Sequence, residues 1–308
     1  MIIALAGGVG GARLAHGLAR VLPPGELSVI VNTGDDFSHL GLHICPDPDT
    51  VMYTLSGLAD PERGWGLQGE TFAAMDALAR LGGESWFALG DRDLATHIER
   101  TRRLNAGETL SSITADFCAR LGIGAHIIPM SDDPIRTIVH TDEGALPFQD
   151  YFVRRRCVPQ VSRLSFEGAA QAAPSPGLLT LMQSDEVRGI VICPSNPFLS
   201  IDPILAVPGL RAWLQARRVP CIAVSPLIGG KAVKGPVAKI MAELHLDATP
   251  RAIAAHYQGL IDGLVIDHAD TAEAFGPCLV TATLMRDIAD RARLASESLS
   301  YIESLRRL

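Results

Sequence analysis

Long apolar segments and an excess of basic residues are both missing from this sequence. Its 27 Lys and Arg are outnumbered by 34 Asp and Glu, which leaves a formal net charge of −7. A protein that mainly neutralises a nucleic-acid backbone needs the opposite sign, so we expect no nucleic-acid partner. The apolar runs are far shorter than the roughly 20 residues of a membrane helix, and Met1 leads directly into a strand-like segment without a basic leader. We therefore expect a cytoplasmic protein with no membrane partner.

Cysteine pairs and low-complexity tracts are missing as well. The six cysteines include no Cys-x-x-Cys pair and have no His at zinc-finger spacing, so neither a zinc site nor a disulfide framework is predicted and buried thiols are expected. Hydrophobic residues make up 47% of the 308 residues and charged residues only 20%, a composition that excludes a disordered or fibrous chain.

Short apolar runs alternate with helical patterns along most of the chain. The runs that predict strands are Ile2–Ala6, Leu27–Val31, Trp86–Leu89, Ala125–Ile128, Gly189–Cys193, Cys221–Val224 and Leu264–Ile266. Helical patterns lie between them, at Ala12–Leu22, Glu70–Leu81, Leu94–Leu104, Leu110–Leu121, Leu210–Arg217, Val237–Leu244 and Arg251–Leu260. This alternation predicts an α/β fold, a three-layer Rossmann-like arrangement around a mainly parallel sheet.

The alternation breaks between Arg136 and Gln183. Thr137–His140, Phe148–Arg154 and Val161–Phe166 resemble short strands, and a small helix should follow the bend at Pro174–Pro176. We predict a small appended α+β subdomain or lid at 136–183, inserted into a nucleotide-binding core formed by 1–135 and 184–308. The last segment, Thr281–Leu308, is expected to be helical and to pack on the body or on a second subunit.

A glycine-rich turn, Gly7 to Ala12, joins the first strand to the first helix. Such glycines allow backbone N–H groups to approach an anion at a helix N-terminus, which makes Gly8, Gly10 and Gly11 phosphate-loop candidates. The turn is neither a Walker loop nor a strict Gly-x-Gly-x-x-Gly pattern. A tight strand–helix turn without a ligand remains the alternative.

Four carboxylates follow the second strand closely. Two lie in the segment Asn32-Thr33-Gly34-Asp35-Asp36, and Asp47 and Asp49 stand ten residues later at the foot of another helix. Hard oxygen ligands at the carboxyl ends of strands suit Mg²⁺ beside a polyphosphate. The alternative is a purely structural role, in which Asp49 caps the helix and Asp36 caps a turn.

Three more polar loops each follow a predicted strand. In Gly90–Asp93 an arginine stands between two acids, which suits a phosphate clamp, although a helix cap and a surface ion pair would use the same residues. The turn Pro194–Pro197 offers Ser195 and Asn196 to a base or ribose, or serves as a rigid turn. The glycine-rich loop Ser225–Pro236 contains two lysines and favours an anion or nucleotide.

All these loops are expected at one edge of the sheet. No Ser–His–Asp triad is indicated, so the predicted site acts by positioning and charge neutralisation, as in phosphoryl transfer.

The loops resemble those of the 2-phospho-L-lactate transferase family of coenzyme F-420 biosynthesis, called CofD in archaea and FbiA in actinobacteria. The resemblance runs nearly end to end. It rests on ten ordered blocks: Gly7–Gly11, Asn32–Asp36, Pro46–Val51, Trp65-Gly66, Leu89–His97, Pro129–Pro134, Phe148–Asp150, Pro194–Pro197, Ser225–Gly229 and Thr283–Met285.

The resemblance implies a transferase, a phosphotransferase for substituted phosphate groups. The ribityl hydroxyl of Fo (7,8-didemethyl-8-hydroxy-5-deazariboflavin) would attack a guanosine diphospho-linked three-carbon acid and release GMP, with Mg²⁺ required. The acid could be 2-phospholactate, phosphoenolpyruvate or 3-phosphoglycerate, and relatives suggest a homodimer. The resemblance puts Asp49 at the reacting centre, so Asp49→Ala is expected to keep the fold and lose turnover.

The loops and the resemblance together predict the site residues. Catalytic roles are expected for Asp49, Asp36 and Arg92, and metal binding for Asp49 and Asp47. Substrate contacts are expected for Gly8, Gly10, Gly11, Asn32, Thr33, Asp91, Ser195, Asn196, Ser225, Gly229 and Lys234.

Two other functions use similar motifs. A regulatory nucleotide-sugar-binding protein of the gluconeogenesis-factor type would share the glycine turn and the Asn-x-x-Asp region. A dinucleotide-dependent oxidoreductase is disfavoured because Asn32, and not an acidic ribose partner, ends the second strand.

Overall fold

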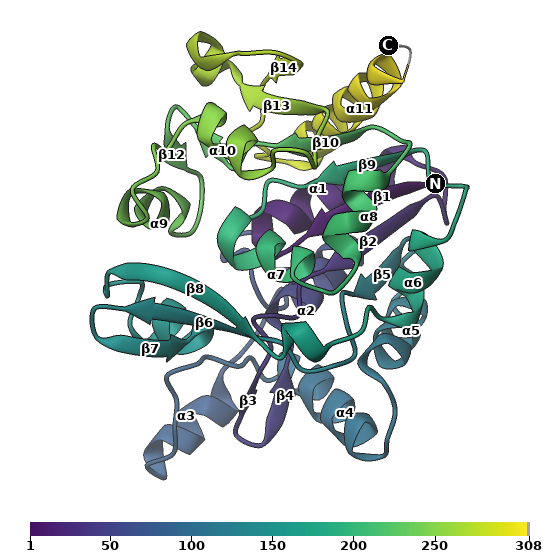
Figure 1. Ribbon diagram of the computed structural model, residues 1–308. Coiled ribbons are helices and arrows are strands. Elements are labelled where there is room, and N and C mark those ends of the chain that lie inside the picture. Colours follow the sequence, from purple (N-terminus) through teal and green to yellow (C-terminus); the bar gives the residue numbers. More distant parts are fainter. Residues whose placement is uncertain (307–308) are drawn as a thin grey trace.

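A seven-stranded parallel sheet forms the centre of the computed structural model, which describes residues 1–306 (Figure 1). The strand order is β14-β13-β10-β9-β1-β2-β5, and every neighbouring pair is parallel. The strands are β1 (Ile2–Ala6), β2 (Leu27–Val31), β5 (His126–Pro129), β9 (Gly189–Ile192), β10 (Cys221–Val224), β13 (Gly263–Asp267) and β14 (Cys278–Thr281). The predicted Rossmann-like α/β fold is confirmed.

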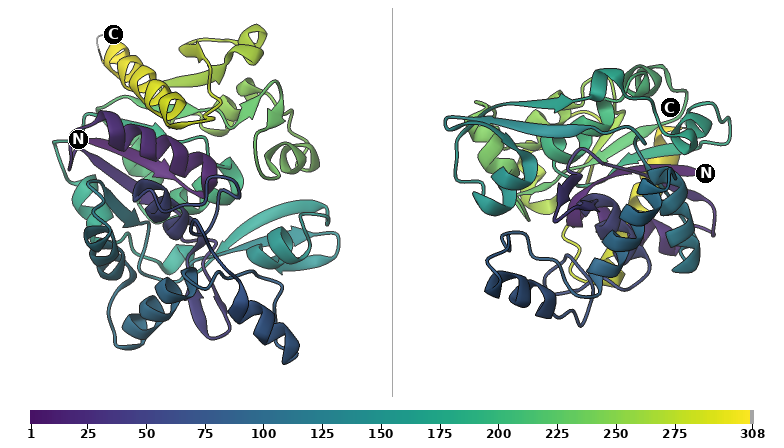
Figure 2. Two further views of the ribbon diagram at one scale, coloured as in Figure 1. Left: turned by 180° about the vertical axis from the view of Figure 1, so that it is seen from behind. Right: turned by 90° about the horizontal axis from the view of Figure 1, so that it is seen from below.

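Helices cover both faces of the sheet, which explains its continuous apolar strands. Along β1, Ile3 and Leu5 enter one hydrophobic core, whereas Ile2, Ala4 and Ala6 enter the other. The helices that contribute to the first core are α6 (Pro176–Met182), α7 (Asp202–Leu205), α8 (Leu210–Ala216), α9 (Val237–Glu243) and α10 (Pro250–His256). The second core is covered by α1 (Gly8–Val21), α2 (Pro46–Leu55), α5 (Leu110–Arg120) and α11 (Ile288–Leu305). The long α11 lies beside α1 on one face (Figure 2).

The chain changes direction across the sheet at β1. It runs outward from β1 through β2 to β5, and it returns to β9 on the other side of β1. A ligand crevice is expected outside the carboxyl ends of strands where the order reverses, here between β1 and β9.

Smaller elements extend beyond the carboxyl ends of these strands (Figure 1). They include the hairpin of β3 (Phe37–His39) and β4 (Leu42–Ile44), the helices α3 (Ala73–Arg80) and α4 (Asp93–Asn105), and a separate antiparallel sheet. That sheet has the order β7-β6-β8 and consists of β6 (Arg136–Thr141), β7 (Gly144–Pro147) and β8 (Val161–Glu167). The division into a core and an inserted unit at 136–183 stays a prediction.

Two predicted strands are wrong, and several strands escaped prediction. The missed strands are β3, β4, β7, β14 and the short hairpin strands β11 (Leu227–Ile228) and β12 (Lys231–Ala232). Trp86–Leu89 forms no strand; Leu89 instead packs with Ile44 and Met75 in a small local cluster. Phe148–Arg154 contains the π-helix η1 (Asp150–Arg154), in which Phe152 stacks on Phe148 at 5.3 Å. The edge strand β14 was missed because it is only partly buried and gives a weak apolar signal. The helix expected from Thr281 onward begins only at Ile288, because Thr281 ends β14 and Asp287 caps the helix.

No helix in the part of the chain that the structure describes is long and apolar enough to span a bilayer.

The buried His16 on α1 predicts a loss of stability in acid. Burial, together with the charges of Arg291 and Arg20, lowers its pKa from 6.5 to about 4. Below pH 6.5 the unfolded chain binds a proton that the folded chain rejects, so the free energy of unfolding should fall between pH 6.5 and 4. Urea unfolding across this range should give a shallower pH dependence for His16→Gln. The same change at exposed His126 should keep the wild-type dependence, and equal slopes for all three proteins would contradict the prediction.

Candidate active site

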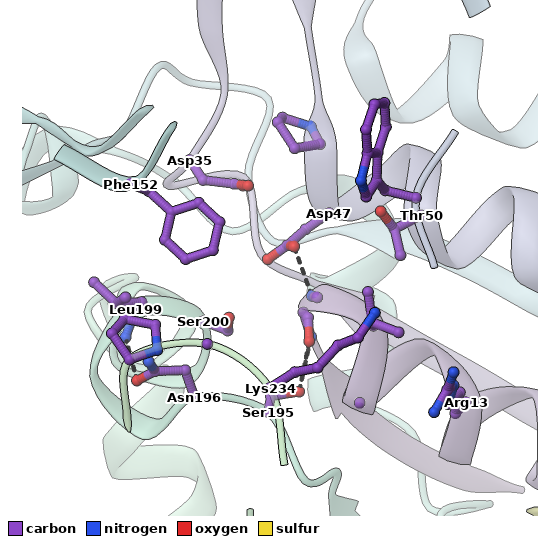
Figure 3. A pocket seen from close by; sticks show the side chains of 18 of the residues that line it. Arg13, Asp35, Asp47, Thr50, Phe152, Ser195, Asn196, Leu199, Ser200 and Lys234 are labelled. Atoms are coloured by element: carbon purple, nitrogen blue, oxygen red, sulfur yellow. Dashed lines mark hydrogen bonds between the residues drawn. The ribbon is translucent and has the colours of Figure 1, made fainter. Parts of the chain in front are cut away.

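A cavity of about 550 Å³ opens at the crevice between β1 and β9 (Figure 3). Its walls come from the glycine turn, the start of α2, the segment 86–88, α4, η1 and the loops that follow β9, β10 and β14. Of the predicted site residues, those that line it are Gly8, Gly10, Asp47, Asp49, Ser195, Asn196, Ser225 and Lys234.

The glycine turn packs tightly against the loop after β9. Ser195 Oγ accepts a hydrogen bond from Gly7 N at 3.1 Å and donates one to Gly7 O at 2.8 Å. A Cβ atom on Gly10 would overlap the carbonyl oxygen of Pro194, and one on Gly11 would overlap Ser195 Oγ. These glycines therefore allow two loops to meet at the floor of the cavity. Gly8 has a φ of +61° and its N–H donates to Asp47 Oδ1 at 2.5 Å.

Gly10→Ala should destabilise the fold because the new methyl group meets a backbone carbonyl that cannot swing aside. Overpacking of this kind costs about 1–3 kcal/mol of unfolding free energy, measurable by urea denaturation. The matched control is Gly124→Ala, where the nearest atom, Pro24 Cβ, lies at an ordinary 3.5 Å. Equal stability of the two variants would show that the loops can separate freely.

Asp35 and Asp47 form a buried carboxylate pair at the cavity wall. They are 5% and 7% exposed, and Asn32 Nδ2 donates to both, at 3.3 Å to Asp35 Oδ1 and 2.9 Å to Asp47 Oδ2. Burial and the neighbouring Asp47 and Asp36 raise the pKa of Asp35 well above its usual value. Burial also raises the pKa of Asp47 to about 6, although its bonds from Asn32 and Gly8 oppose this. Asn32 is therefore a positioning residue beneath the cavity wall.

Asp36 does not line the cavity, unlike the adjacent Asp35. Its Oδ2 accepts from Cys45 Sγ at 3.0 Å and lies 3.3 Å from His43 Nε2. Thr33, also buried, stands outside the lining too. The sequence pattern could not separate Asp35 from Asp36, because the direction of each side chain depends on the tight turn between β2 and β3.

Asp49 lies in the cavity wall, but both of its oxygens are engaged by Arg100 of α4. Arg100 is only 2% exposed, and the Asp49 carboxylate raises the pKa of its guanidinium against the lowering effect of burial. Arg100 compensates the charge of Asp49, whereas Asp35 and Asp47 accept hydrogen bonds only from neutral groups within residues 1–306. Asp49, Asp93 and His97 nevertheless offer ligand atoms within 4.8 Å of one another, so metal binding by Asp49 stays a prediction.

Asp93 heads α4 and faces the cavity. Its Oδ1 accepts from Tyr53 Oη at 2.6 Å and lies 3.3 Å from His97 Nε2. Arg100 Nη1 approaches His97 Nδ1 at 3.3 Å, and because a guanidinium can only donate, this ring nitrogen acts as the acceptor. Burial raises the pKa of Asp93, but His97 and Tyr53 lower it below its usual value overall. Asp93 is therefore an ionised carboxylate whose Oδ2 can bind a ligand.

The predicted clamp residues Asp91 and Arg92 do not line the cavity. Asp91 caps α3 by accepting from Ala73 N and Ala74 N, both at 3.0 Å, and Arg92 Nη1 donates to Gln68 O at 3.0 Å. The helix cap that the sequence offered as an alternative was expected at Asp93; the structure instead has Asp91 as the cap, at the start of α3.

The remaining predicted loops contribute in different ways. Asn196 Oδ1 accepts from Phe198 N at 3.0 Å, while its buried Nδ2 has no protein partner within residues 1–306. Ser225 Oγ accepts from Leu227 N at 3.2 Å at the start of its loop. Gly229 does not line the cavity, because its N–H donates to Asp270 Oδ2 at 3.0 Å.

Two features of the cavity were missed. Arg13, one turn into α1, lines it with Lys234, and burial and the charge of Arg13 lower the pKa of Lys234. Neither cation is paired with a carboxylate within residues 1–306; Arg13 donates to Met285 O at 3.2 Å and Lys234 to Arg63 O at 3.1 Å. In Figure 3 both lie in the lower half of the view, with Asp35 and Asp47 in the upper half.

Aromatic side chains are the second missed feature. Only 5% of the chain is aromatic, yet six of its sixteen Phe, Trp and Tyr residues line this cavity: Tyr53, Trp65, Trp86, Phe87, Phe148 and Phe152. They come from four separate segments, so no local pattern indicates them.

The chain has close relatives among known proteins. A phosphoenolpyruvate transferase of Streptomyces griseus is 43% identical over 99% of both chains. A 2-phospho-L-lactate transferase of Methanosarcina mazei is 39% identical over 89% of each chain.

Among solved structures, a UPF0052 family member from Bacillus halodurans superimposes with a TM-score of 0.63. It is 13% identical and covers 97% of this chain and 98% of its own, which supports the fold alone. The sequence model of the family described as 2-phospho-L-lactate transferase CofD matches residues 2–296. The chain therefore belongs to the 2-phospho-L-lactate transferase family.

Proposed function

We propose that this protein is a transferase of coenzyme F-420 biosynthesis that moves a phospho-three-carbon-acid group from a guanosine diphospho-linked donor to the ribityl hydroxyl of Fo, releasing GMP. The observation that carries the proposal is one cavity that combines carboxylates, unpaired cations and clustered aromatic rings. The relatives named above are transferases, and none of them supports a regulatory nucleotide-sugar-binding protein.

The three-carbon acid of the donor is proposed to be enolpyruvyl phosphate. The relative that is 43% identical over 99% of this chain carries the name phosphoenolpyruvate transferase, whereas the 2-phospho-L-lactate transferase is 39% identical over 89%. These acids differ by small groups, and comparing turnover on the three donors decides among them.

Each substrate has a matching region of the cavity. The flat deazaflavin ring suits the aromatic side chains, because such rings stack well on Trp and Phe. The donor diphosphate suits Arg13 and Lys234. Within residues 1–306 the side chains of both cations donate only to neutral carbonyl oxygens. Asn196 Nδ2, buried and without a protein partner within residues 1–306, is free to bind an oxygen of the guanosine.

A magnesium ion fits beside Asp35 and Asp47. Their only side-chain and backbone donors within residues 1–306 are neutral, and two desolvated carboxylates with raised pKa values gain most from a cation. When bound there, Mg²⁺ would neutralise charge on the bridging diphosphate. This assignment replaces Asp49 by Asp35 as the partner of Asp47.

The transfer makes one bond and breaks another. The ribityl oxygen forms a bond to the phosphorus that carries the acid, the bond from this phosphorus to the bridging oxygen breaks, and GMP leaves with the electron pair. The hydroxyl proton passes to Asp93 Oδ2, since the hydrogen bond from Tyr53 Oη occupies Oδ1. Arg13 and Lys234 offset the charge that builds up on the leaving phosphate.

The assay supplies Fo, the guanosine diphospho-linked acid and Mg²⁺ and identifies the product by mass. A phosphodiester-linked deazaflavin together with GMP is the expected result. Binding of NAD in place of GDP, with no product, would contradict the proposal. The protein is further proposed to act in the cytoplasm and to form a homodimer. Light scattering after size-exclusion chromatography measures the molar mass and so tests the homodimer.

A further inference from the structure

The turn after β13 carries two carboxylates that stand behind the cavity walls. Asp267 ends β13, and Asp270 lies in the short helix η4 (His268–Glu273); they are 9% and 5% exposed. Neither residue lines the cavity. Each accepts hydrogen bonds from the backbone of a different segment that does.

Asp270 holds the hairpin that leads to Lys234. Its Oδ2 accepts from Gly229 N at 3.0 Å and its Oδ1 from Gly230 N at 3.2 Å. These glycines, with φ of +57° and +70°, form the two-residue turn between β11 (Leu227–Ile228) and β12 (Lys231–Ala232). Lys234 lies two residues after the end of β12, so the position of its backbone depends on this turn.

Asp267 holds the segment that orients Arg13. Its Oδ2 accepts from Thr283 N at 2.7 Å and from Thr283 Oγ1 at 3.2 Å. The residues Thr283 to Met285 line the cavity, and the carbonyl of Met285 accepts from Arg13 Nη1 at 3.2 Å. The Asp267 carboxylate therefore holds the segment whose Met285 carbonyl orients the Arg13 guanidinium.

We propose that Asp267 and Asp270 are positioning residues for the diphosphate of the donor, acting through two backbone segments on Arg13 and Lys234. The proposal rests on the proposed function and names which residues tune donor affinity. Like charges repel, so two cations aimed into one cavity need anchored surroundings to stay there before an anion binds. The junction of β13 and η4 supplies both anchors, which makes the two cations a single preorganised site.

The test compares Asp270→Asn with wild type in steady-state kinetics. The amide offers one acceptor where the carboxylate offers two, and charge-assisted hydrogen bonds are about twice as strong as neutral ones. We expect the KM for the guanosine diphospho-linked donor to rise roughly tenfold, with the KM for Fo and kcat nearly unchanged, since each 1.4 kcal/mol is tenfold. Calorimetric titration with GDP should show the same loss without any need for turnover. The matched control is Glu273→Gln, an exposed carboxylate of the same turn.

A double-mutant cycle separates positioning from general stabilisation. If Asp270 acts through Lys234, then Asp270→Asn should add little to the loss caused by Lys234→Met, and Asp267→Asn should likewise add little to Arg13→Met. Additive losses, or GDP affinity equal to wild type in both aspartate variants, would overturn the inference. Absence of product from the wild type would instead refute the proposed function, and the GDP titrations would still decide whether the two aspartates position the cations.

Discussion

Asp35→Asn should lower turnover by at least about 100-fold. Asp35 is proposed to hold Mg²⁺, a bound metal ion supplies several kcal/mol of charge stabilisation, and each 1.36 kcal/mol is tenfold in rate. The variant should also need much more Mg²⁺ for half-maximal activity. Its thermal midpoint at pH 7.5 should not fall, since the neutral amide removes the repulsion from Asp47 and Asp36 that raises the pKa of Asp35.

The neighbouring residue provides the matched control. Asp36→Asn is the same chemical change one position along, at a side chain that bonds to Cys45 and stands outside the cavity. It should cost about 1 kcal/mol of stability through a weakened buried hydrogen bond and leave the Mg²⁺ dependence intact. A larger rate loss in Asp36→Asn than in Asp35→Asn would reverse our assignment of the two carboxylates.

Asp49→Ala should unfold far more easily than wild type. Removing Asp49 leaves the Arg100 guanidinium, 2% exposed, without a counter-charge, and breaking a buried pair in this way costs about 3–5 kcal/mol. Chemical denaturation measures this loss directly. The sequence alone led us to expect a catalytic loss with an intact fold, so the Arg100 contact revises that expectation.

A double variant distinguishes the two roles of Asp49. Asp49→Leu combined with Arg100→Met removes both charges, and such replacements of buried pairs are often neutral in stability. The double variant should regain most of the stability that Asp49→Ala loses. If it also regains full turnover, then Asp49 has no part in the reaction; if Asp49→Ala alone is as stable as wild type, then the ion pair is not structural.

The fold was predictable because its central strands are apolar on both faces, a strong and local signal. The same argument failed at Trp86–Leu89, where aromatic residues pack against the β3–β4 hairpin and not into a sheet. Local signals likewise located the glycine turn and the Ser195–Asn196 turn at the cavity. They could not find Arg100, which meets Asp49 only because α4 folds back across 51 positions of chain.

Roles within the loops were harder to predict than the loops themselves. The sequence does not distinguish Gly229, whose amide is taken by Asp270, from Gly10, which faces the cavity. Arg13 escaped notice because a lone arginine on a helix is ordinary, and only the fold brings it near Lys234. Such differences depend on contacts between distant segments, which no local pattern records.

The hydrogen bonds between Gly7 and Ser195 also set an order of events during synthesis. The two residues are 188 positions apart, so the floor of the cavity cannot close until nearly two thirds of the polypeptide has left the ribosome. Contacts of such long range form late and slowly. A nascent chain that ends before β9 therefore contains the glycine turn but lacks the loop that closes the cavity floor, so it cannot yet form the proposed donor site.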